Sequence, residues 1–216
     1  MRKLAILTVS AFILSIVSVP MVMAQAKPTP VKEPAKAPAK PAVPKEPIKL
    51  GAIYCFAGPC YMYSESAIHG IRIAQEEINA KGGIMGRKLD VTVRDTEMKV
   101  DVGARETKDL ILREKVHFLE GPCSSGVGLA MQVVHSEYKV IRVTTMANTE
   151  AQVVDKFTPY IFQIVPNTYY EAIAATRYLN KKAPTAKKFC TIAPDYEFGR
   201  REESAFEEEI KRLVPD

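Results

Sequence analysis

Strand-like and helix-like patterns alternate along residues 48–216. The run from Ile48 to Tyr54 predicts a strand, which ends at a turn containing Gly58-Pro59. Apolar residues then recur at spacings of four, three and four, which predicts a helix with one apolar face: Ala67, Ile71, Ala74 and Ile78. By the same reasoning, later strands are predicted at 89–93, 117–120, 140–144, 160–165 and 188–193, and later helices at 101–115, 127–134, 169–182 and around Phe206, Ile210 and Leu213. This alternation favours an α/β fold with a parallel sheet flanked by helices on both faces.

The loops that follow the strands are the expected place for function. In open parallel sheets, ligands bind in the crevice beyond the carboxyl ends of the strands. One such loop is a Gly-Pro-Cys-Ser-Ser-Gly turn, in which Ser125 lies where a predicted helix begins. Free backbone N–H groups and the positive end of the helix dipole favour a small anion there. The alternative is that Ser124 or Ser125 only caps the helix, as Asp101 is expected to cap the preceding one.

The N-terminal residues have a different pattern. Arg2 and Lys3 precede an apolar run that extends to Val19, and Val22-Met23-Ala24 resembles a cleavage site. This layout predicts a secretory signal peptide over residues 1–26 and therefore a periplasmic location. The apolar run is short for a membrane span, which needs about 20 residues, and an uncleaved membrane anchor is the alternative.

Residues 27–47 form a second distinct segment. They contain seven prolines, five lysines and four alanines, a composition that predicts a semi-rigid, polyproline-like linker. The formal net charge of +5 comes from this segment and the leader, because residues 48–216 carry 23 basic and 23 acidic side chains. A neutral folding region argues against nucleic acid as a partner, since binding to phosphates needs a clustered basic surface.

Four cysteines bear on the redox chemistry of the chain. An oxidising periplasm allows cysteines to pair, and we expect one bridge among Cys55, Cys60 and Cys123. Cys190 lies inside a hydrophobic run and is expected to be a buried free thiol. The spacing matches no zinc pattern, so neither a metal site nor a cofactor is expected.

Several motifs in the folding region resemble those of a known family. They are Ile48 to Pro59, Gly70, Glu76-Glu77-Ile78-Asn79, Gly82-Gly83-Ile84, Gly86-Arg87, the turn from Gly121 to Gly126, and Asp195-Tyr196-Glu197-Phe198-Gly199. Together they resemble type I periplasmic binding proteins of the leucine/isoleucine/valine-binding branch. The resemblance implies two hinged α/β lobes with a ligand between them, of which residues 48–167 would be an incomplete first lobe and residues 168–216 the truncated start of the second.

The same resemblance implies a function. Such a protein would be an extracytoplasmic receptor that captures an amino acid or similar carboxylate-bearing solute and delivers it to a membrane ABC permease. Ser125, next to Ser124, matches the family serine that binds the ligand carboxylate, and Met146 matches a position that contributes a backbone carbonyl. Asn148 occupies the place of a threonine that contacts the ligand. The asparagine is a departure from the family pattern, and ordinary loop structure is the alternative role for both Met146 and Asn148.

Three further positions are carried over from the family. Thr168 aligns where amino-acid binders often have an aspartate near the ligand ammonium, so a neutral side chain there argues against a standard branched-chain amino acid. Tyr63 and Phe198 match aromatic residues that cover the ligand from the first and second lobes. Packing in the core or at the lip of the cleft is the alternative role for both rings.

An enzyme is not expected. Nucleophilic catalysis needs a base near the nucleophile, and His69, His117 and His135 are placed by the predicted elements away from Ser125. The Ser-Ser turn also lacks the first glycine of a G-x-S-x-G elbow. A serine hydrolase that uses Ser125 is therefore the weaker alternative, and a membrane-tethered ligand-sensing domain of the same fold is the stronger one.

Overall fold

The fold was established from a computed structural model, which describes residues 46–214. The predicted signal peptide at 1–26 and all but the last two residues of the predicted linker at 27–47 lie outside the described residues. Among the helices that are described, none is long and apolar enough to cross a membrane.

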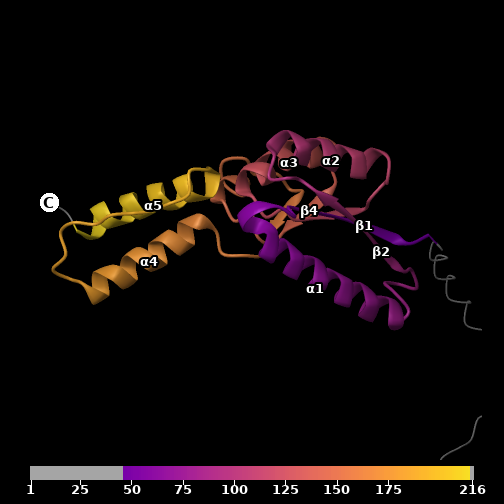
Figure 1. The fold of residues 1–216 in the computed structure, drawn as a ribbon, viewed down its shortest axis with the longest axis horizontal. Helices are drawn as coiled ribbons and strands as arrows, with labels where there is room; N and C mark the ends of the chain where they lie inside the picture. The colour runs from indigo at the N-terminus through magenta and orange to yellow at the C-terminus, as the bar shows by residue number, and fades with distance from the viewer. Residues whose placement is uncertain (1–45, 215–216) are drawn as a thin grey trace, which may run out of the picture. The chain divides into compact units, whose positions relative to one another are not determined.

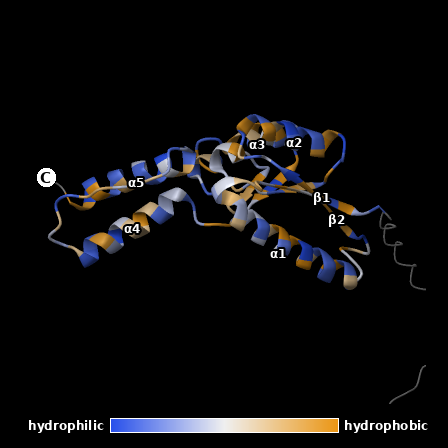
Figure 2. Cartoon of the chain, viewed as in Figure 1, coloured by the Kyte–Doolittle hydropathy of each residue, from blue (hydrophilic) through white to orange (hydrophobic). Residues whose placement is uncertain are grey.

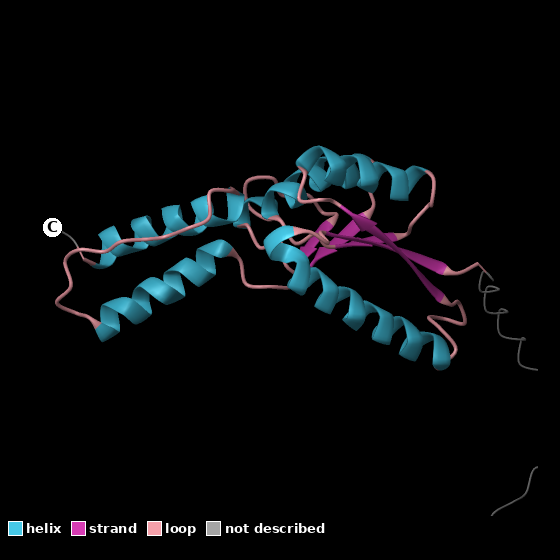
Figure 3. Ribbon diagram, in the orientation of Figure 1, coloured by secondary structure: helices cyan, strands magenta, loops and turns pink. Residues whose placement is uncertain are grey.

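A five-stranded parallel sheet forms the centre of the described chain, as the sequence pattern predicted (Figure 3). Its strands are β1 (Ile48–Tyr54), β2 (Leu89–Asp95), β3 (Phe118–Glu120), β4 (Ile141–Thr144) and β5 (Ile161–Gln163). They lie in the order β2-β1-β3-β4-β5, and every adjacent pair is parallel. β2 therefore lies on one side of β1, and β3, β4 and β5 follow on the other side. At such a change of direction, the loops after β1 and β3 lie next to each other at one edge of the sheet.

Helices cover both faces of this sheet, with α1 (Tyr61–Ala80) on one face and α2 (Val100–Leu112) and α3 (Ser125–Glu137) on the other (Figure 1). The chain also forms α4 (Thr168–Lys182) and α5 (Glu197–Leu213), and the short 3-10 turns η1 (Gly58–Cys60) and η2 (Glu150–Gln152). Side chains of β1 alternate between two buried clusters: Ile53 packs with residues of α2 and α3, whereas Ala52 and Tyr54 pack on the α1 side. This period of two is expected for a strand that is covered on both faces.

Helices α2 and α3 pack closely because a glycine lies between them. A Cβ atom at Gly103 of α2 would come within 2.4 Å of Val127 Cγ1 on α3. No side chain other than hydrogen therefore fits at this crossing unless Val127 or one of the helices shifts. The tight contact helps to fix the start of α3, which bears Ser125.

Helices α4 and α5 lie side by side and extend beyond the sheet (Figure 1). Arg177 Nε of α4 donates to Glu209 Oε1 of α5 at 2.8 Å. Glu209 also accepts from Arg212, and these hydrogen bonds lower its pKa to about 2. Hydrophilic residues predominate along α5, whereas hydrophobic residues are concentrated in the strands (Figure 2).

Two predictions for the C-terminal region were wrong. Residues 188–193 form no strand, because a strand needs a hydrogen-bonded neighbour and no described strand lies beside them. Ile192 is fully exposed as a result. Cys190 is likewise an exposed free thiol rather than a buried one, because the core that would cover it does not form there.

The predicted helix cap at Asp101 was also wrong. Lys99 is the N-cap residue and α2 begins at Val100, so Asp101 lies within the first turn. A carboxylate in that turn still interacts favourably with the positive end of the helix dipole.

Candidate functional site

A pocket of about 490 Å³ opens beyond the carboxyl ends of β1, β3 and β4. This is the edge of the sheet at which ligands of parallel α/β folds bind. Its walls come from three parts of the chain: the η1–α1 region, the loops that follow β3 and β4, and the segments around the starts of α4 and α5. The first part supplies Pro59, Cys60 and Tyr63, and the second supplies Cys123, Ser125, Thr145, Met146 and Asn148. The third part supplies Val165, Pro166, Glu171, Tyr196 and Phe198.

Five of the seven residues that the sequence singled out line this pocket together. They are Tyr63, Ser125, Met146, Asn148 and Phe198. Ser124 and Thr168 do not line it. The pocket thus brings together residues that are as much as 135 positions apart in the chain, which only the tertiary fold can do.

Ser125 is the first residue of α3, and Ser124 is the N-cap residue. Ser124 has an extended backbone, yet its side chain makes no capping hydrogen bond. Ser125 is only 1% exposed but reaches the pocket wall. The backbone N–H groups of a first helical turn have no partner within the helix, so this corner of the pocket supplies hydrogen-bond donors at the positive end of the helix dipole.

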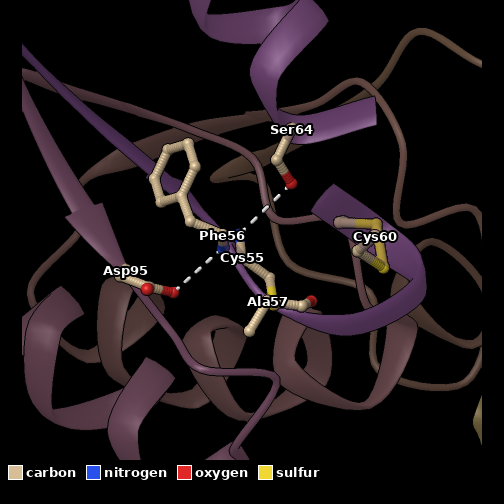
Figure 4. The surroundings of a disulfide bond; sticks show 7 residues. Cys55, Phe56, Ala57, Cys60, Ser64 and Asp95 are labelled. Carbon is tan, nitrogen blue, oxygen red and sulfur yellow. Dashed lines mark hydrogen bonds between the residues drawn. A yellow bond between two sulfur atoms is a disulfide. The ribbon is translucent and has the colours of Figure 1, made fainter. Parts of the chain in front are cut away.

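A disulfide joins two of the pocket walls. Cys60 of η1 is bonded to Cys123 in the loop before α3, with their Cα atoms 6.3 Å apart. The prediction of one bridge among Cys55, Cys60 and Cys123 is confirmed, and Cys55 is a buried free thiol. The end of β1 is held at the same place, because Cys55 N donates to Ser64 Oγ at 3.3 Å and Phe56 N donates to Asp95 Oδ1 at 3.2 Å (Figure 4).

Thr168 forms hydrogen bonds in the protein interior and does not line the pocket. Its side chain is fully buried, its hydroxyl donates to Glu150, and its backbone N donates to the Asn148 carbonyl at 3.0 Å. These bonds fix the start of α4 against the loop that follows β4. The pocket residue that α4 supplies is Glu171, one turn further along.

Glu171 was missed by the sequence reasoning. Its carboxylate Oε2 accepts a hydrogen bond from Asn148 Nδ2 at 3.0 Å, and both residues line the pocket. A signal was present in the sequence, because residues three positions apart on a helix share a face and Thr168 had been placed at the ligand. The same turn of the helix therefore offered a carboxylate that the pattern alone did not single out.

Thr145 is a second residue that was missed. It lines the pocket, and its hydroxyl donates to Glu120 Oε1 at the end of β3. The Tyr54 hydroxyl also donates to this carboxylate oxygen, and burial raises the pKa of Glu120. The Thr145 oxygen also lies 2.9 Å from the Tyr54 hydroxyl, so these three side chains form one hydrogen-bonded group at the wall of the pocket.

The three histidines all lie outside the pocket. His135 is fully buried, where burial and the nearby Arg142 lower its pKa to about 3. Across the described residues, no group of three or more His, Cys, Asp and Glu side chains is arranged to hold a metal ion. The pocket therefore presents polar groups of both kinds, with hydrogen-bond donors around Ser125 and the carboxylate of Glu171 as an acceptor.

Comparison with known proteins agrees with this architecture. A family model described as periplasmic binding protein matches residues 47–214, which is almost the whole described chain. The chain belongs to the periplasmic binding protein family. Its members and the matched relatives are solute-binding proteins and not enzymes, so the hydrolase alternative for Ser125 is set aside.

Individual relatives belong to the Leu/Ile/Val-binding branch of the periplasmic binding protein family. The Leu/Ile/Val-binding protein homolog 7 of Brucella abortus is 31% identical over 135 residues, which cover 62% of this chain and 33% of the relative. A branched-chain amino acid transporter substrate-binding protein of Streptococcus pneumoniae, solved with isoleucine, has a TM-score of 0.70 at 23% identity. That match covers 76% of this chain and 47% of the solved chain.

A further solved structure shows the range of ligands on this fold. A solute-binding protein of an ABC transporter from R. palustris, solved with 4-hydroxybenzoate, has a TM-score of 0.67 at 23% identity and covers 77% of this chain and 44% of the solved one. At these identities the solved structures support the fold alone. The chain spans about a third of the curated relative's length and about half of the solved ones.

Proposed function

We propose that this chain is part of an extracytoplasmic solute-binding protein, which captures an amino acid or similar small carboxylate-bearing solute for uptake by a membrane ABC permease. The observation that carries the proposal is the position of Ser125, at the start of α3 and in the wall of a pocket large enough for such a solute. Isoleucine and 4-hydroxybenzoate, the ligands named for two solved relatives, both carry a carboxylate. A helix N-terminus suits that group, because its N–H groups point at the ligand.

The lobes assigned from the sequence fit this proposal. Residues 48–167 would form the first lobe, which supplies Ser125, Met146, Asn148 and Tyr63. Residues 168–216 would begin the second lobe, which supplies Phe198. Tyr196 and Phe198 lie with their ring centroids 5.9 Å apart beside the pocket, where they can cover an apolar part of the solute. Closure of the two lobes about a hinge would then couple capture to delivery.

Binding is tested by a thermal-shift screen of the purified protein against amino acids, aromatic acids and amides. A specific solute at about 100 times its Kd adds about 2.7 kcal/mol to the free energy of unfolding. A screen in which carboxylate-bearing solutes raise no melting temperature contradicts the proposal.

The role of Ser125 is tested by Ser125→Ala. We expect the affinity for the solute found in the screen to fall roughly tenfold, because one donor to a carboxylate is lost while the backbone N–H groups remain. Isothermal titration calorimetry measures the change. Ser66→Ala is the matched control, because Ser66 is exposed on α1 and bonds only to the Met62 carbonyl of its own helix.

A further inference from the structure

Strand β4 carries a buried arginine at a position where the alternation of the strand calls for an apolar side chain. Arg142 is fully buried and lies in register with Leu119 of β3. Leu119 packs in the core cluster on the α2 and α3 face of the sheet, and paired residues of neighbouring strands share a face. The guanidinium of Arg142 therefore lies under α3, the helix that begins at Ser125.

This cation has no counter-ion among the described residues. Its hydrogen bonds go to neutral acceptors, because Nη1 donates to the Gly128 carbonyl at 2.8 Å and Nη2 donates to Gln152 Oε1. Its Nε has no partner, and none of the ion pairs in the described part of the chain includes Arg142. Burial lowers the pKa of Arg142 to about 9, which leaves the guanidinium protonated at neutral pH. A buried charge without a partner is destabilising, and a bound anion nearby offsets that penalty.

Both hydrogen bonds of Arg142 lead to walls of the pocket. Gly128 lies in the first turn of α3, three positions after Ser125. Gln152 passes the connection on, because its Nε2 donates to the Ala147 carbonyl at 2.8 Å. Ala147 belongs to the loop after β4, and its two neighbours in the sequence line the pocket. The buried cation is thus bonded to the helix start and, through Gln152, to the loop, and both of these form the wall.

The pocket wall itself has no positive side chain. Glu171 is the one charged residue among those that line it, and its carboxylate repels an anion. Arg201 of α5 is already paired with three carboxylates. The start of α3 contributes only about half an elementary charge. A carboxylate beside Ser125 therefore has one unpaired cation close behind the wall, which is Arg142.

We propose that Arg142 is a positioning residue of the solute site, which acts through α3 and supplies the positive charge that balances the carboxylate of a bound solute. The inference rests on the proposed function and deepens it, because it names the source of the charge that selects anions. Arg142 does not touch the solute. Its hydrogen bonds to Gly128 and Gln152 hold the charge at a fixed place behind the wall, and the low polarity of the interior strengthens its effect there.

Pairs of solutes that differ in one charge test this role. The pairs are 4-hydroxybenzoate with 4-hydroxybenzamide and L-isoleucine with L-isoleucinamide, in which an amide of nearly the same shape replaces the carboxylate. Calorimetry at pH 7 should show each carboxylate binding more tightly than its amide. Arg142→Gln should lower that ratio roughly tenfold, because a unit charge behind the wall is removed. A loop that shifts in the variant weakens both members of a pair, and this loss cancels in the ratio.

A second variant neutralises the arginine without removing it. Gln152→Glu keeps an acceptor for Arg142 Nη2 and adds a carboxylate as counter-ion, so the ratio should fall as it does in Arg142→Gln. Arg142→Lys, which keeps the charge, should retain most of the ratio. Arg105→Gln is the matched control, because Arg105 is exposed on α2 and its charge is screened by solvent. The melting temperature of each variant without solute shows whether it is folded.

The outcomes separate this inference from the function on which it rests. An unchanged ratio in folded Arg142→Gln or folded Gln152→Glu overturns the role of Arg142, and the solute-binding function stands. Amides that bind the unmodified protein as tightly as the carboxylates overturn it as well, and that measurement needs no variant. Binding of none of these four solutes, together with no response in the thermal-shift screen, contradicts the proposed function itself.

Discussion

Side chains in the pocket differ in how firmly the protein holds them. Ser125 is 1% exposed at the start of a helix, and Asn148 is tied to Glu171. Tyr63, in contrast, is 64% exposed on α1. Fixed polar groups set the orientation of a solute with little loss of side-chain entropy on binding, whereas an exposed ring must be ordered when the solute arrives. We therefore expect the polar residues to govern specificity and Tyr63 to add mainly apolar contact.

The state of the cysteines can be checked residue by residue. In the native protein without reductant, a thiol reagent such as DTNB should label Cys190 rapidly, because it is exposed, and Cys55 slowly, because it is buried. Unfolding without reductant should expose both thiols, and reduction should release Cys60 and Cys123 as well. Cys190→Ser is the control that should abolish the rapid phase. Rapid labelling of two thiols in the native state would contradict the burial of Cys55.

At the scale of elements, the contact between α2 and α3 depends on Gly103. Gly103→Ala should lower the free energy of unfolding by about 1–3 kcal/mol, because its new methyl group overlaps Val127 and forces the helices apart. Urea denaturation followed by circular dichroism measures the change. Gly70 of α1 provides the control: nothing lies within 4 Å of a Cβ built there. Gly70→Ala should therefore raise stability by about 0.5–1 kcal/mol, and equal effects at the two sites would refute the close contact.

The elements that periodicity predicted best are those whose partners lie in the described chain. The strand from Ile48 to Tyr54 was predicted at its observed bounds, and its neighbours pair with it along their length. Residues 188–193 have the same apolar character but remain without a strand partner. Local pattern reports what a segment prefers, whereas a strand forms only when another segment completes its hydrogen bonds.

The candidate site was likewise predictable only where it depends on local sequence features. Ser125 could be singled out because a turn before a helix is a local feature. Glu171 was not singled out, although it shares a helix face with Thr168, because its partner Asn148 lies 23 positions earlier and on another element. The pairing of Thr145 with Glu120, 25 positions apart, escaped the sequence for the same reason. Pockets are made by long-range contacts, and a single sequence carries little information about them.

At the scale of the whole molecule, the N-terminus distinguishes a free receptor from a tethered sensor. If residues 1–26 are a signal peptide, mass spectrometry of the exported protein should show a chain that begins at Gln25 or close to it. Ala24→Leu should block cleavage, because a small side chain is needed at the cleavage site. An intact leader on the unmodified exported protein would instead support the membrane-tethered sensing domain.

The bond between Cys60 and Cys123 has a consequence for how the pocket works. It fastens the turn at the end of β1 to the loop that presents Ser125, so that two segments 63 residues apart form one rigid wall. A preorganised wall does not have to be reassembled each time a solute arrives, because its ordering was completed when the chain folded. The wall around Ser125 is therefore held by a covalent bond before any solute arrives, and its ordering adds no entropic cost to binding.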